Sequence, residues 1–168
     1  MKKFIFLFIF LCNLLHSEEQ TIDPQYIPIN TQEVVNFFND KNKRWLMVGT
    51  GNLSLVFFDT KTAQYNKNTK TVKGWFKYMI TPSGRLEYIK RARNGGYYNS
   101  YWHEDLVAKI LFEEFNLTNN KVRVLSVTDY DSNDNNIYSY EDDKPNWEEI
   151  VPDSVSEQIL DELKKRYR

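Results

Sequence analysis

A strongly marked amphipathic helix closes a chain that otherwise consists of short apolar runs separated by turn sequences. Ser154 and Glu157 have the spacing of a capping box, in which two residues at a helix start satisfy each other's backbone donors. Pro152 precedes this pair, and its fixed φ stops the helix from extending backwards. Behind the cap, five apolar residues recur at helical spacing and share one face. They are Val155, Ile159, Leu160, Leu163 and Tyr167.

A helix of about three turns is marginal alone in water, so this one needs a surface to cover. The preceding sequence supplies a sheet, because runs rich in Val, Thr and aromatic residues alternate with Gly, Asn and Asp turns. The expected strands are 45–48, 53–58, 72–80, 121–130 and 137–140. We therefore predict an α+β fold: an antiparallel meander sheet of five or six strands, with the C-terminal helix packed across one face.

Three other segments complete this outline. A short helix is expected from about Arg85 to Arg93, since a Gly-Gly pair follows it. The stretch QYNKNTK, residues 64–70, is expected to be a polar loop. Residues 106–117 fit two structures: Leu106, Val107, Ile110 and Leu111 follow helical spacing, whereas the apolar residues before NLTNN fit a strand that ends in a hairpin.

The N-terminus carries the pattern of a secretory signal peptide. Two lysines precede an apolar run over residues 4–15, which is too short for a stable membrane span, and small Ser17 marks the cleavage site. The alternative is lipidation at Cys12, where Leu11 replaces the small residue that lipoprotein signals require. The expected organisation is a signal peptide over 1–17, a leader with a short helix over 18–42, and a folded domain over 43–168.

The mature chain has little of the chemistry that catalysis requires. Removal of residues 1–17 takes away two lysines and leaves 20 basic against 23 acidic residues, so no basic excess indicates nucleic acid or an anionic membrane as a partner. Cys12, the only cysteine, leaves with the signal. His103 is then the only histidine, which excludes a Cys-His pair and a multi-histidine zinc site. We expect no catalytic site, no cofactor and no metal.

Two polar stretches are candidate sites. In DYDSNDNN, four residues offer oxygens suited to calcium: Asp129, Asp131, Asn133 and Asp134. The glycine and glutamate of an EF-hand loop are missing, so a hairpin turn is the preferred interpretation. The basic group Lys90, Arg91 and Arg93 lies next to GGYYNSYW and is a candidate surface for an acidic protein segment or a glycan. The alternative for this group is a solvated helix face.

Three stretches, in this order, resemble the surface-adhesin protein E family of small exported bacterial proteins. They are RWLMVGTGNLSLVFFDTKT, KILFEEFNLTNNKVRVLSVTDYDSNDNNIYSY and WEEIVPDSVSEQILDEL, and they extend the resemblance from about Lys43 to Leu163. The resemblance implies a sheet crossed by the terminal helix and favours a strand over 109–117. Family members commonly tie helix to sheet by a disulfide, but Leu117 stands at the first cysteine position here. Packing of Leu160 and Leu163 must replace that bond.

The family's named member is an outer-surface adhesin that binds host matrix and serum proteins. For this chain we therefore expect an exported, non-enzymatic binding module in the periplasm or on the outer cell surface. Its partner would be a host matrix or serum protein, or a component of the envelope, and the mature chain would have no membrane span. The alternatives are a periplasmic structural or accessory protein, and a small-ligand carrier that uses the concave face of the sheet.

Overall fold

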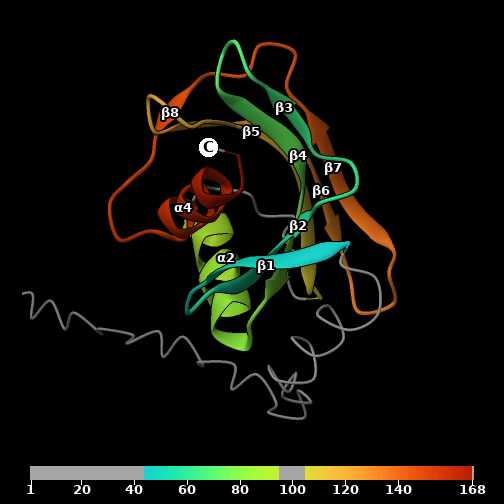
Figure 1. The fold of residues 1–168 in the computed structure, drawn as a ribbon. Helices are drawn as coiled ribbons and strands as arrows, with labels where there is room; N and C mark the ends of the chain where they lie inside the picture. The colour runs from blue at the N-terminus through green and yellow to red at the C-terminus, as the bar shows by residue number, and fades with distance from the viewer. Residues whose placement is uncertain (1–43, 95–104, 168) are drawn as a thin grey trace, which may run out of the picture.

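The computed structural model describes residues 44–94 and 105–167, which form one antiparallel sheet and two helices (Figure 1). Six strands follow each other in the order β1-β2-β4-β5-β6-β7, while short β3 pairs with β4 and short β8 pairs with β6. The strands are β1 Trp45–Thr50, β2 Ser54–Asp59, β3 Gln64–Asn66, β4 Thr71–Ile80, β5 Ala108–Asn116, β6 Lys121–Tyr130, β7 Asn136–Glu141 and β8 Glu148–Glu149. The helices are α2 Pro82–Asn94 and α4 Val155–Tyr167. The predicted α+β meander with a C-terminal helix is confirmed.

Two local predictions need correction. The predicted loop over 64–70 is wrong at its start, because Gln64–Asn66 forms β3; its Tyr65 packs on Tyr167, with ring centroids 5.2 Å apart. Helix α2 begins at Pro82 rather than near Arg85, because Thr81 caps it: the Thr81 hydroxyl accepts a hydrogen bond from the Gly84 amide at 3.0 Å. The ambiguous segment is a strand from Ala108 onward.

Helix α4 crosses one face of the sheet and completes the core. Three residues of the helix, Ile159, Leu160 and Leu163, are buried against strand residues. The buried strand partners, together with Leu117 just after β5, are Val48, Val56, Phe58, Val72, Phe76 and Phe115. Val155 shares the apolar face expected to pack on the sheet, but it is only half-buried, because the first turn of α4 lies at the rim beside Gly49 of β1 and Gly51 of the β1–β2 turn.

The start of α4 forms a capping arrangement that differs in one arm from the standard box. The Ser154 hydroxyl accepts a hydrogen bond from the Glu157 amide at 3.2 Å, as the spacing predicts. The Glu157 carboxylate accepts from the amide of Asp153 at 2.7 Å, one residue before the cap. Asp153 has a φ of 59°, so the chain turns sharply there before entering the helix.

Helix α4 also bonds the end of one edge strand of the sheet. The side-chain amide of Gln158 accepts from the Thr50 amide and donates to the Thr50 carbonyl, both at 3.1 Å. This amide therefore bonds β1 much as a neighbouring strand would. The opposite edge is formed by β7 and, further along β6, by β8.

Candidate functional site

The two faces of the sheet differ because both helices lie on the same side of it, within its curve (Figure 1). Phe76 of β4 packs with the α4 residues, and side chains alternate along a strand. Lys73, Trp75 and Lys77 therefore point to the opposite face, which neither α2 nor α4 covers. We call this the open face.

Polar side chains form a continuous row across four strands of the open face. The strand register aligns Gln64 of β3, Lys73 of β4, Glu114 of β5 and Arg123 of β6. The Arg123 guanidinium donates to Glu114 Oε2 through Nε at 2.9 Å and Nη2 at 2.6 Å. Alternating charges on directly opposed residues stabilise the sheet and hold these side chains in place.

Aromatic rings lie beside this row. Trp75 stacks on Phe112 of the neighbouring strand, with ring centroids 4.6 Å apart and planes at 26°. The Lys73 ammonium lies 4.8 Å from the Phe112 centroid, and the Arg123 guanidinium lies 4.5 Å from that of Trp147. Cation–π contacts of this kind fix the orientation of both partners. We call the set the open-face strip: Gln64, Lys73, Trp75, Phe112, Glu114, Arg123 and Trp147.

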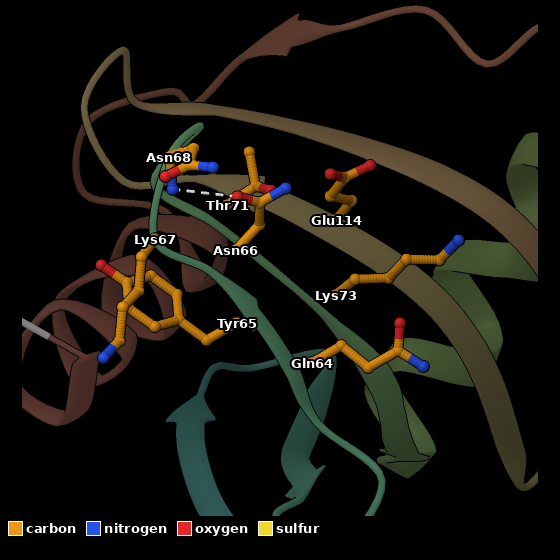
Figure 2. Close-up of a pocket in the computed structure, with 8 residues that line it drawn as sticks. All are labelled: Gln64, Tyr65, Asn66, Lys67, Asn68, Thr71, Lys73 and Glu114. Atoms are coloured by element: carbon orange, nitrogen blue, oxygen red, sulfur yellow. Dashed lines mark hydrogen bonds between the residues drawn. The ribbon is translucent and has the colours of Figure 1, made fainter.

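One end of the strip opens into a hollow of about 440 Å³ (Figure 2). Gln64, Lys73 and Glu114 extend on one side of the β3–β4 hairpin, while Tyr65 points the other way, toward α4. Asn66 is committed to the turn, because its side-chain oxygen accepts from the amides of residues 68 and 69 at 2.9 and 3.3 Å. Among the described residues, the Lys73 ammonium has no ion-pair partner, so a ligand can approach it.

The helix-covered face holds a separate buried polar cluster. Glu113 is 4% exposed and accepts a hydrogen bond from the Tyr78 hydroxyl at 3.0 Å. Burial raises the pKa of Glu113 to about 7, and the bond from Tyr78 offsets this only in part. Nearby, the Lys109 ammonium contacts Asp129 at 2.8 Å and lies 5.1 Å from the ring centroid of Tyr88 on α2.

Comparison with known proteins places the chain in a family. The sequence model of the family described as surface-adhesin protein E matches residues 45–163, most of the chain. The chain belongs to the surface-adhesin protein E family. No curated protein sequence matches this family member.

Two solved structures are similar to this chain. The structure of Haemophilus influenzae protein E aligns with 76% of this chain and 89% of its own, at 8% identity and a TM-score of 0.47. Crystal form II of the same protein aligns with 76% of this chain and 92% of its own, at 8% identity and a TM-score of 0.48.

The basic group expected from the sequence lies on α2, away from the open-face strip. Lys90 and Arg91 are exposed, and Arg91 donates to Glu87 one turn earlier at 2.9 Å, so its charge is partly satisfied within the helix. Arg93 belongs to α2, but its side chain lies outside the described residues. The aromatic segment expected beside these residues, 97–102, lies outside them as well.

The stretch DYDSNDNN, the calcium candidate, forms the turn between β6 and β7. Asp131 accepts hydrogen bonds from the amides of Asn133 and Asn135 and from the Asn135 side chain, at 2.8 to 2.9 Å, and Asp134 has a φ of 60°. The stretch is thus an Asx-stabilised hairpin turn. Residues 44–94 and 105–167 contain no cluster of three or more His, Cys, Asp or Glu side chains placed for a metal.

Some expectations concern residues outside the described part of the chain. His103, the signal peptide over 1–17 and the short helix of the leader are among them. Within the described part, neither helix has the length and apolar character needed to cross a membrane.

Sequence reasoning did not assemble the open-face strip. Trp75 lies within the expected strand over 72–80, and no local motif marks it as a site residue. The alternation of Lys73, Trp75 and Lys77 was the signal available, because it places them on one face. The partners across the sheet depend on strand register, and no local pattern gives that register.

Proposed function

We propose that this member of the surface-adhesin protein E family is an exported, non-enzymatic binding module that holds a protein partner on its open face. Family membership supports the adhesin-like character. The N-terminal lysines, apolar run and Ser17 support export. The partner classes are a host matrix or serum protein and an envelope component.

The observation that carries this proposal is the composition of the open-face strip. Tryptophan and arginine dominate the binding energy of protein interfaces because they combine large apolar area with directed hydrogen bonds. Here Trp75, Trp147 and Arg123 lie on a face that α2 and α4 leave uncovered. Stacking and ion pairing already order these side chains, so a partner would lose less conformational entropy on binding them.

The test is capture of partners by the mature domain from matrix proteins and envelope extract, followed by affinity measurement. Trp75→Ala and Arg123→Ala should each weaken binding by about tenfold or more, the usual scale for an interface hot spot. Leu86→Ala is the matched control, because Leu86 is an exposed apolar residue on α2. Equal binding by wild type and both strip variants would refute the proposal.

The location of the protein decides between the two partner classes. Protease treatment of intact cells should degrade a module on the outer surface and spare one in the periplasm. Degradation would assign the open face to host proteins, and protection would assign it to an envelope component. N-terminal sequencing of mature protein should begin at Glu18, and a chain that begins at Met1 would contradict export.

A further inference from the structure

The two edge strands of the sheet, β1 and β7, differ in whether another element bonds their outer backbone groups. At the β1 edge, Gln158 of α4 bonds both the amide and the carbonyl of Thr50. At the other edge, no described strand pairs with the outer side of β7. Exposed strand edges present backbone donors and acceptors that template pairing with another chain, so proteins commonly cover them.

The backbone orientation of β7 follows from one hydrogen bond. The Asp142 amide donates to the Leu125 carbonyl of β6 at 2.9 Å, which continues the regular register from Tyr138 to Glu141. In an antiparallel pair, alternate residues direct both backbone groups toward the neighbouring strand. Ser139 and Glu141 therefore direct their amides and carbonyls away from β6, as a partner strand requires.

The side chains and loops around this edge are acidic. Residues 131–143 contain five carboxylates and no lysine or arginine. Asp134, Glu141 and Asp143 are exposed. Lys77 lies close enough to Asp134 to interact with its charge, whereas Lys109 is paired with Asp129 on the helix-covered face. A strand that pairs here would meet a negative surface and gain from positive charge.

We propose that the outer edge of β7 binds an extended, basic segment of a protein partner, which joins the sheet as an additional antiparallel strand. Backbone bonds to Ser139 and Glu141 supply the pairing, and basic side chains meet the carboxylates. Tyr138 and Tyr140, 40% and 53% exposed on one side of β7, offer apolar contact to every second residue of the segment. The preferred segment thus alternates basic and apolar residues.

Charge disfavours two occupants from this chain itself. A second copy pairing through β7 would place the same five carboxylates against each other. Residues 18–42 carry five acidic residues against one lysine, so the leader would also be repelled. The inference concerns the outer backbone edge of β7 rather than the residues of the open-face strip, so each proposal can fail while the other holds.

The experiment uses the mature domain and a nine-residue peptide of alternating lysine and valine. We expect binding that weakens with added salt, together with slowed hydrogen exchange at the Ser139 and Glu141 amides. Ser139→Pro should weaken binding by about tenfold or more, because it removes an outward donor and blocks strand addition. Its control, Ser139→Ala, loses the same side-chain bonds but keeps the amide, and should bind as wild type does.

A second pair of variants tests the charge without altering the backbone. Glu141→Lys combined with Asp143→Lys should weaken binding by about tenfold and reduce its salt dependence. Asp161→Lys, at an exposed acid on α4, should leave binding unchanged. The proposal is overturned if Ser139→Pro binds the peptide as tightly as Ser139→Ala. It is equally overturned if an alternating glutamate–valine peptide binds as tightly as the basic one.

Discussion

Glu113 makes the stability of this protein depend on pH in an unusual direction. Its pKa in the folded state is about 7, above the ordinary value of 4.5, because the side chain is buried under the helices. Between these two pH values the folded state keeps a proton that the unfolded chain has lost. The free energy of unfolding therefore falls as pH rises from about 4.5 to about 7, and above that Glu113 adds no further slope.

Replacement of this carboxyl by an amide should remove that slope. Glu113→Gln keeps an oxygen that accepts from the Tyr78 hydroxyl but has no proton to lose. Between pH 4.5 and pH 8, the free energy of unfolding of the variant should rise relative to that of wild type by up to about 3 kcal/mol. Urea unfolding of both proteins at the two pH values measures this, because other titrating groups cancel in the comparison. An equal difference at both pH values would contradict the buried-acid account.

At the scale of elements, the start of helix α2 is fixed to the β1–β2 turn. The Thr81 amide donates to the Leu53 carbonyl at 3.0 Å, and the Ser83 hydroxyl donates to the Asn52 carbonyl at 2.7 Å. Gly84 lies at the closest approach, where an added Cβ would overlap the Leu53 carbonyl oxygen. Helix α2 can therefore pack this closely on the β1–β2 turn only because residue 84 has no side chain.

Gly84→Ala tests that contact by setting two effects against each other. Alanine favours a helix over glycine by about 1 kcal/mol. The overlap is with backbone, which cannot rotate away, and overpacking of this kind costs about 1–3 kcal/mol. We expect net destabilisation in chemical unfolding, whereas Lys90→Ala on the exposed side of α2 should change stability by less than about 0.5 kcal/mol. A stabilised Gly84→Ala protein would show that α2 does not dock so closely.

Over the whole molecule, the sequence predicted those features that have a local pattern. Helix α4, with its cap and apolar stripe, and the Val-rich strand β6 could be predicted from the sequence. In each of them the hydrophobic periodicity and the flanking turn residues lie within one short segment. The short strand β8, Glu148–Glu149, has no such pattern and exists only through its pairing with β6. The open-face strip was missed for the same reason: Glu114 meets Arg123, and Gln64 meets Lys73, only once the register is set.

The whole fold depends on α4, because apolar contact, supported by the Gln158–Thr50 hydrogen bonds and with no covalent link, holds this helix to the sheet. Ile159, Leu160 and Leu163 cover Val48, Phe58 and the residues of β4 and β5 behind them, and Leu117 lies in the same cluster. Residues 13–168 contain no cysteine that could link helix and sheet. Leu160→Ala should therefore lower the free energy of unfolding by about 2–5 kcal/mol, as for other truncations of core leucines.

Deletion of all residues after Pro152 is the corresponding test for the whole molecule. It should expose this apolar face, and also free the Thr50 backbone groups that Gln158 bonds. Both effects favour association between sheets, so we expect aggregation in light scattering and size-exclusion chromatography. Deletion of residues 164–168 is the control, since it removes only the end of α4 and spares Leu163. A soluble monomer with an unchanged melting temperature after the longer deletion would mean that α4 is not part of the core.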